Sequence, residues 1–205
     1  MTTSSYMSFE RQIEDLKASL ISDGKQDYLD YRREDHHRAL GFRVLASANL
    51  EHFVEDRCRV AASDAVENHL KRRPNRASKC LLIWHSVGKW EEIPVETSEL
   101  TVYDRVKFRE VLNNYHRSID KMHGIDGRKL RQLLIPLGFR THELDEYVQL
   151  FDRLDALADQ RNQAAHIRVN RMKQMQLPIQ EYLAINRLMN LLKSLDADLE
   201  KISNP

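Results

Sequence analysis

Residues 28–69 contain no proline and a single glycine, Gly41, and this feature constrains the fold more than any other. Proline and glycine end or weaken helices, so their near absence predicts one long helix. The apolar residues of this stretch form a broad surface: Leu40, Val44, Leu45, Ala48, Phe53 and Val54. We therefore expect a mostly buried helix at the centre of the fold.

Apolar residues elsewhere recur every three or four positions, the spacing that puts side chains on one helix face. This pattern covers residues 9–20, where a helix should end near residues 23–24, and also residues 108–122. The apolar run at residues 80–87 fits a short helix or a buried extended segment, and we favour the helix. Thr101 is a candidate N-cap for the helix at residues 108–122.

The C-terminal part of the chain continues the helical pattern. Pro136 and Gly138 should end a short helix in KLRQLLIPLGF, and Thr141 should cap the next helix. The apolar seam of that next helix consists of Leu144, Tyr147, Phe151, Leu154 and Ala158. The seam of the last helix consists of Ile185, Leu188, Met189, Leu192, Leu195, Leu199 and Ile202. The sequence thus predicts an all-α bundle.

Composition supports one domain of this class. The 205 residues are 41% hydrophobic, with only 6 glycines and 5 prolines, which suits one well-buried core and not a β-sandwich or barrel. We expect a single helical domain over residues 1–205, with its core at about residues 30–200. The sequence lacks a secretory signal and any run of the roughly 20 apolar residues that a membrane span requires. We therefore expect a cytoplasmic protein without membrane contact.

Charge and cysteine content exclude some classes of site. The formal net charge of +1 provides no overall field for nucleic acid, so RNA binding would depend on local basic clusters. Cys58 and Cys80 lack the spacing of metal ligands and make a weak case for a disulfide. His36 and His37 have no distal set of ligands, so we expect neither a metal nor a cofactor.

The helix with the seam at residues 144–158 continues into RNQAAH, residues 161–166. One further turn brings Asn162 onto the apolar face and another brings His166, so polar residues stand where apolar ones should continue. Arg161 and His166 are separated by about 140° around an ideal helix and by roughly 7.5 Å along it. They therefore flank a sector that one phosphodiester can span.

A structural explanation competes with this one, because polar residues at a helix end need only a hydrogen-bond partner. Similar separations occur in three other pairs: Arg32 with His37, Arg109 with His116, and Arg117 with His123. The pair in RNQAAH differs in context. Asn162 directly follows Arg161 at the end of an amphipathic helix, and an apolar C-terminal helix can pack behind it.

Three stretches together resemble HEPN domains, particularly the RiboL-PSP-like branch. They are RALGFRVLASANLEHFVEDRC, GIDGRKLRQLLIPLGF and LDEYVQLFDRLDALADQRNQAAH. The shared pattern is a long apolar helix with an acidic residue, a short helix ending in Leu-Gly, and a helix ending in RN-x-x-AH. The resemblance covers about residues 30–200 and implies an all-α HEPN-type bundle with additional helices that dimerises around the motif.

The resemblance also implies a site. Arg161 and His166 match the catalytic positions of the motif and Asn162 its supporting polar position. Glu51 matches the acidic residue of the long helix. Candidate RNA contacts near the motif are Arg168, Arg171 and Lys173. HEPN toxins silenced by nucleotidylation carry a tyrosine where this chain has Arg168, so that form of control is not expected.

The function implied is metal-independent cleavage of RNA, in a toxin or an anti-phage defence effector. The implied partners are RNA, a second copy in a homodimer, and a cognate antitoxin or regulatory protein. His166 would transfer protons at the ribose 2′-hydroxyl or the leaving 5′-oxygen, while Arg161 would bind the phosphate. Two alternatives stay open: a non-catalytic HEPN module that binds RNA, nucleotide or a partner protein, and a structural helical protein in which RNQAAH is incidental.

Overall fold

The structure, a computed structural model, describes residues 3–21, 30–71, 73–87, 105–166 and 177–203, without the side chains of residues 87, 105–107 and 162–166. These residues contain no β-strand, which confirms the predicted all-α class. In chain order the elements are α1 (Ser4–Leu20), α2 (Arg33–Leu70), α3 (Arg76–Val87), α4 (Arg105–Asp120), α5 (Gly127–Leu134), the 3-10 helix η2 (Ile135–Leu137), α6 (Thr141–Asp145), α7 (Val148–His166) and α8 (Pro178–Ser203).

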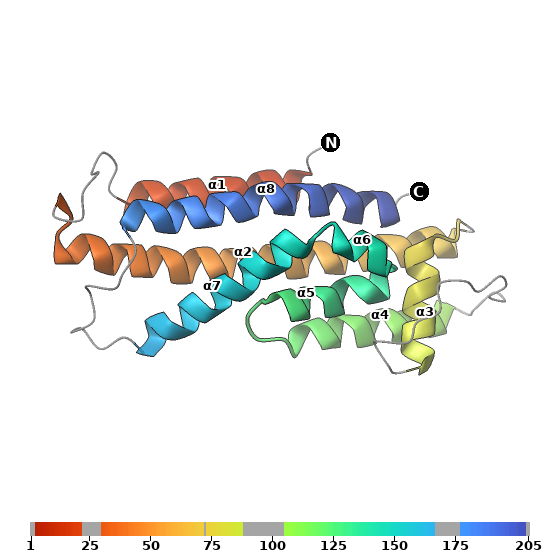
Figure 1. The fold of residues 1–205 in the computed structure, drawn as a ribbon. Helices are drawn as coiled ribbons and strands as arrows, with labels where there is room; N and C mark the ends of the chain where they lie inside the picture. The colour runs from red at the N-terminus through yellow and green to blue at the C-terminus, as the bar shows by residue number, and fades with distance from the viewer. Residues whose placement is uncertain (1–2, 22–29, 72, 88–104, 167–176, 204–205) are drawn as a thin grey trace.

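Helix α2 runs along the whole length of the molecule, and the other helices pack around it (Figure 1). α1 and α8 lie side by side against α2, with α8 running in the same direction as α2 and α1 in the opposite direction (Figure 1). α7 crosses α2 obliquely, α4 and α5 lie beside its C-terminal half, and α3 lies at one end of the bundle (Figure 1). α7 therefore ends at the opposite end of the molecule from α3.

The buried face of α2 explains how one helix contacts so many others. Its first half buries large side chains such as Phe42 and Leu50, both fully buried. Its second half buries Ala61, Ala62 and Ala65, each 1% exposed or less. Small side chains on a helix let its neighbours approach closely, so the second half of α2 has room for neighbours on several sides.

One prediction about α2 is wrong. Val44 and Leu45, expected in the core, are each 47% exposed, and Ala48 of the same predicted surface is exposed as well. The buried face follows Phe42, Ala46 and Leu50, so Val44 and Leu45 fall on the other side of the helix. No element of the described residues covers them there.

The helix predicted to start at Thr141 is in fact two helices, α6 and α7, and its N-cap residue is Arg140. The chain turns at residues 146–147, where the amide of Tyr147 donates to the carbonyl of Leu144 at 3.0 Å. Leu144, Tyr147, Phe151 and Leu154 are all buried, so the predicted apolar seam is continuous although the helix is not.

The other helix boundaries mostly agree with the sequence. The apolar run at residues 80–87 is helical, within α3, and Gly138 follows η2 with a φ of 90°, as a helix-ending glycine should. The first helix ends at Leu20, earlier than predicted, with Ile21 extended. The predicted cap Thr101 lies outside the described residues.

The two cysteines lie in the interior as free thiols. Burial raises the pKa of Cys58 to about 12 and also raises the pKa of Cys80, so neither thiol is activated as a nucleophile. Among the helices that the structure describes, none is both long and apolar enough to span a membrane.

Candidate functional site

The RNQAAH motif forms the last two turns of α7. Arg161 is the motif residue whose side chain the structure describes, since the side chains of Asn162 and His166 lie outside the described part. The candidate RNA contacts Arg168, Arg171 and Lys173 lie outside it as well. The site is therefore built from Arg161 and the residues around it.

Arg161 lies next to Glu51, the acidic residue predicted on the long helix. Arg161 Nη1 is 3.7 Å from Glu51 Oε2, and the two side chains are 28% and 22% exposed. This distance is that of an ion pair and exceeds hydrogen-bonding distance. An ion pair of this exposure contributes about 0–1 kcal/mol to the free energy of unfolding. Because the pair is weak, Glu51 can orient the guanidinium without preventing it from binding an anion.

Gly124, in the connection between α4 and α5, is the third member of this group. Its amide donates to Glu51 Oε1, and its φ is +74°. A Cβ atom at this position would lie 2.3 Å from Arg161 Nη2 and 2.9 Å from Arg161 Cζ. The guanidinium thus occupies the space where any other residue would place its side chain. Glu51, Gly124 and Arg161 come from three separate segments and meet at one point.

Two further contacts fix the part of α7 that carries Arg161. Arg43 of α2 donates from Nη1 to the carbonyl of Gln160 at 3.2 Å. Its Nε donates to Glu181 Oε2 at 2.8 Å, and its Nη2 pairs with the other oxygen of Glu181, in the first turn of α8. Arg43 and Glu181 are both buried. This bidentate pair therefore ties the motif end of α7 and the start of α8 to α2.

On its other side α7 contacts the start of α5. Asp155 Oδ1 accepts a hydrogen bond from the amide of Gly127 at 2.8 Å. A Cβ atom on Gly127 would lie 2.8 Å from the backbone oxygen of Phe151, so α5 packs directly on the α7 backbone. The connection that contains Gly124 is thereby placed beside Arg161.

The electrostatic surroundings of Glu51 include a second carboxylate. Burial raises the pKa of Glu55, one turn along α2; Arg59 opposes this rise and the negative charge of Glu51 adds to it. Among the described residues, no group of His, Cys, Asp or Glu has the arrangement of a metal site.

The RiboL-PSP-HEPN family model matches residues 9–201, from the first half of α1 to the last turn of α8. The chain belongs to the RiboL-PSP-HEPN family. No curated protein and no solved structure matches it. HEPN domains are often ribonucleases and commonly bind RNA or nucleotide, so membership supports this class of function.

Sequence reasoning about this HEPN chain named Glu51 and Arg161, which the structure brings together. It missed Gly124 as a contact of Arg161, and it missed Arg43 and Glu181. Gly124 stood out only as a break between helices. Arg43 is a charged residue on an otherwise apolar face of α2. Because a buried charge needs an oppositely charged partner, its position was the one sign in the sequence of an ion pair with another helix.

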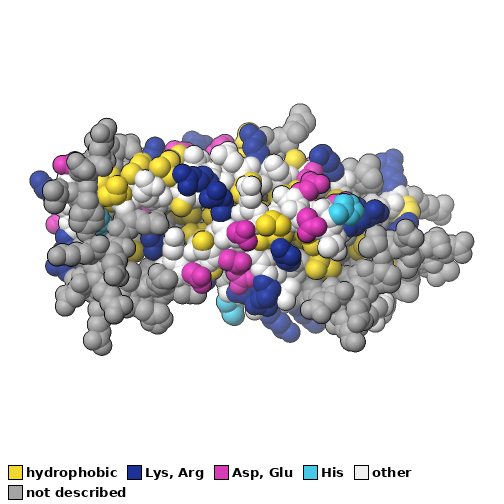
Figure 2. Space-filling view, in the orientation of Figure 1, with side chains coloured by type: hydrophobic (Ala, Val, Ile, Leu, Met, Phe, Trp, Pro, Cys, Tyr) yellow, Lys and Arg dark blue, Asp and Glu magenta, His cyan; other side chains and the backbone are white. Residues whose placement is uncertain are grey.

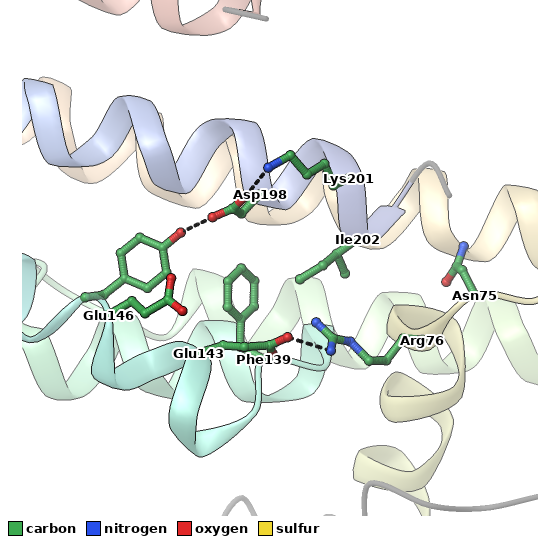
Figure 3. Close-up of a pocket in the computed structure, with 9 residues that line it drawn as sticks. Asn75, Arg76, Phe139, Glu143, Glu146, Asp198, Lys201 and Ile202 are labelled. Carbon is green, nitrogen blue, oxygen red and sulfur yellow. Dashed lines mark hydrogen bonds and ion pairs between the residues drawn. The ribbon is translucent and has the colours of Figure 1, made fainter.

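A cavity of about 410 Å³ lies elsewhere in the HEPN bundle, between the start of α3, the loop before α6 and the end of α8 (Figure 3). Phe139, Tyr147 and Ile202 line it together with charged residues. Tyr147 donates to Asp198 at 2.5 Å. Arg76 donates to Glu143 at 2.7 Å, and Figure 3 shows these two side chains facing each other. Its main polar groups thus pair with one another.

The pKa values agree with these pairs. Burial and the Asp198 carboxylate raise the pKa of Tyr147. Burial favours the neutral form of Asp198, but hydrogen bonds from Lys201 and Tyr147 outweigh it and lower the pKa. The elements that line the cavity meet near α3, whereas the motif end of α7 points toward the other end of the bundle (Figure 1).

On the described part of the face shown in Figure 2, neither positive nor negative charge predominates. Basic and acidic side chains are interspersed over the face shown in Figure 2. This agrees with the net charge of +1 and means that RNA binding would use local groups.

Proposed function

We propose that this HEPN protein is an endoribonuclease that cleaves RNA without a metal ion, through Arg161 and His166. The observation that supports the proposal is the placement of Arg161 at the motif end of α7, oriented by Glu51 and Gly124. The guanidinium of Arg161 donates no hydrogen bond to any other described residue. Its N–H donors are therefore available to a phosphate.

The proposed reaction uses the substrate's own nucleophile. The ribose 2′-oxygen attacks the phosphorus, its proton passes to an imidazole, and the bond to the 5′-oxygen breaks as that oxygen gains a proton. The products are a 2′,3′-cyclic phosphate and a 5′-hydroxyl. An internal nucleophile needs no metal to generate it, and DNA, which lacks the 2′-hydroxyl, should resist.

Each motif residue has a role in this scheme. Arg161 binds the phosphate and stabilises the charge that grows on its oxygens. His166 transfers the proton, since histidine titrates near neutrality, and Asn162 orients it by hydrogen bonding. In a homodimer whose twofold axis passes near the motif, one His166 serves as base and the other as acid.

Further expected roles lie next to the motif. Arg168, Arg171 and Lys173 follow it directly in sequence and would contact the RNA backbone. In the cell we propose a toxin or an anti-phage defence effector, with a cognate antitoxin or regulatory protein as partner. Toxicity on expression that Arg161→Ala relieves would support this role, and a toxicity that Arg161→Ala leaves unchanged would contradict it.

The test is incubation of the purified protein with total RNA and tRNA in EDTA, with analysis of fragment ends. Wild type should cut and leave 2′,3′-cyclic phosphate and 5′-hydroxyl ends, and His166→Ala should not cut. His142→Ala, which removes an exposed histidine on α6, is the matched control and should cut like wild type.

If wild type, His166→Ala and His142→Ala all left the RNA intact, the nuclease proposal would be wrong. That result would favour a HEPN module that binds RNA, nucleotide or a partner protein. Cleavage that His166→Ala retains would place the chemistry elsewhere. Circular dichroism of each variant shows whether its helices are intact.

A further inference from the structure

The connection between α4 and α5, which contacts Arg161 through Gly124, carries exposed basic side chains. Lys121, His123 and Arg128 lie within four positions of Gly124, the residue on which the guanidinium of Arg161 rests. All three are exposed. We call these three residues the basic strip.

The carboxylates near the basic strip are already engaged. Glu51 accepts from the Gly124 amide and pairs with Arg161. Asp126 caps α5 by accepting from the amide of Lys129 at 2.7 Å. Asp155 accepts from the amide of Gly127 at 2.8 Å. Each of these carboxylates therefore fixes the shape of the connection or the position of Arg161.

Lys129 has the same structural role and is not part of the basic strip. Its ammonium donates to the carbonyl of Gly124 at 3.0 Å and to that of His123. It also lies 3.9 Å from Asp126 Oδ2. These two hydrogen bonds fix the backbone of the connection at Gly124, the residue that contacts Arg161.

Lys121, His123 and Arg128 differ from their neighbours in making no side-chain hydrogen bond or ion pair with the rest of the described chain. Two fixed positive charges and an imidazole thus lie exposed, without a partner in the described chain, on the segment whose Gly124 contacts Arg161. Such a group attracts an anion from outside the molecule, more strongly at low salt.

We propose that the basic strip binds the phosphate backbone of the RNA next to the bond that Arg161 engages. This inference rests on the proposed function and adds the path by which the RNA strand reaches the site. Arg128 offers two parallel N–H donors to one phosphate, Lys121 a compact charge, and His123 a ring N–H. Because these groups meet only phosphate, they position the strand without reading its sequence.

The test measures binding apart from cleavage. A fluorescent single-stranded 2′-O-methyl RNA cannot be cut by 2′-oxygen attack, and its affinity is measured by anisotropy over a range of salt concentrations. The variant is the double substitution Lys121→Gln and Arg128→Gln. The matched control is Arg11→Gln with Arg109→Gln, which removes two exposed arginines on α1 and α4 that likewise have no partner in the described chain.

Two lost phosphate contacts should reduce the slope of log affinity against log salt by about 1.4, since each contact with a single strand contributes about 0.7. Affinity near physiological salt should fall by on the order of tenfold, and the control should match wild type. Equal salt slopes for wild type, variant and control would contradict the proposal that the basic strip binds RNA. Binding of poly-glutamate in place of RNA would overturn it too and point to an acidic protein partner.

This experiment separates the inference from the nuclease proposal. A wild type that binds the 2′-O-methyl RNA through Lys121 and Arg128 but leaves ordinary RNA intact supports the basic strip and refutes catalysis. A wild type that cuts RNA while the double variant keeps its salt slope supports catalysis and refutes the basic strip.

Discussion

At Gly124 the backbone has a φ of +74°, and the space where a side chain would begin is taken by Arg161. Sequence reasoning identified Gly124 as a break between helices, because glycine ends regular structure. It had no means to predict the contact with Arg161, because no periodic pattern relates residues so far apart in the chain. Glu51 was predicted only because the family pattern includes an acidic residue on the long helix.

Gly124→Ala should therefore affect both stability and cleavage. A non-glycine residue at positive φ costs about 1–2 kcal/mol of unfolding free energy. The added methyl group must also displace the guanidinium of Arg161, and a displacement of this kind at a catalytic group lowers rate by roughly 10²-fold. Urea unfolding and kcat/KM for RNA cleavage measure the two effects.

Gly41→Ala is the matched control for this substitution. Gly41 lies inside α2, and an added Cβ would meet nothing within 4 Å. Alanine should raise the unfolding free energy by about 0.5–1 kcal/mol, because it favours the helix, and it displaces no part of Arg161. If Gly124→Ala cut RNA as fast as wild type, Gly124 would have no positioning role.

At the scale of whole helices, the sequence predicted the elements better than their ends and faces. The apolar seam at residues 144–158 is buried as far as Leu154, yet α6 and α7 are separate helices. An apolar seam indicates which side chains face the core but not where a helix ends. The turn at residues 146–147 leaves the same face buried and contains no glycine or proline, so the sequence gives no sign of it. Val44 and Leu45 were misplaced because a helix with apolar residues on several sides does not show which side is covered.

The pairing of Arg43 with Glu181 was missed for a related reason. Hydrophobic periodicity registers only apolar positions, so a charged pair buried between α2 and α8 leaves no periodic signal. Such a pair matters for function here because Arg43 also binds the Gln160 carbonyl, one residue before Arg161.

Arg43→Met should lower the unfolding free energy by about 3–5 kcal/mol, because it leaves the Glu181 carboxylate buried without a partner. The double variant Arg43→Met with Glu181→Leu should recover most of that loss, since it removes both charges. Urea unfolding of the two variants measures the difference.

Lys71→Met provides the control for an ion pair in water. Lys71 and Glu67 are 62% and 63% exposed, so their pair should contribute no more than about 0.5 kcal/mol. If the double variant at Arg43 and Glu181 were no more stable than Arg43→Met alone, packing of the arginine stem and not charge would explain the loss.

For the whole molecule, the partly buried histidines His69 and His116 should make stability depend on pH. Partial burial lowers the pKa of His69, and the positive charge of Lys79 lowers it further. Partial burial also lowers the pKa of His116, where it outweighs a hydrogen bond with the Arg59 backbone and the Asp120 carboxylate, both of which raise the pKa. The unfolded chain then binds protons that the folded chain does not, so unfolding free energy rises with pH. Above about pH 6.5, the usual histidine pKa, both states hold these histidines neutral and the unfolding free energy is at its full value. As the pH falls below that value, the unfolded chain takes up the protons first and the unfolding free energy declines.

Urea unfolding between pH 7.5 and pH 5 should therefore show declining stability in wild type and a flatter profile in a variant with His69→Gln and His116→Gln. His142→Gln, which replaces an exposed histidine, serves as the control for composition. An equally steep profile in the double variant would assign the pH dependence to other groups.

The proposed homodimer needs a self-complementary surface near the motif, and α2 offers one. Val44 and Ala48 are exposed, and they lie on the same side of α2 as Glu51, because positions seven apart nearly coincide around a helix. Leu45, also 47% exposed, extends this apolar area. Exposed apolar side chains that adjoin a site commonly mark an interface.

Val44→Glu should consequently convert the protein to a monomer and reduce cleavage at least tenfold, since a negative charge buried in an interface without a partner costs several kcal/mol. Sedimentation velocity measures the mass, and the RNA assay measures the rate. Met7→Glu introduces the same charge on α1 at a residue that is 54% exposed, and it should leave both mass and rate unchanged. A Val44→Glu protein that stays dimeric would move the interface to another face, whereas a monomeric wild type that cuts RNA would show that one copy of the motif is sufficient.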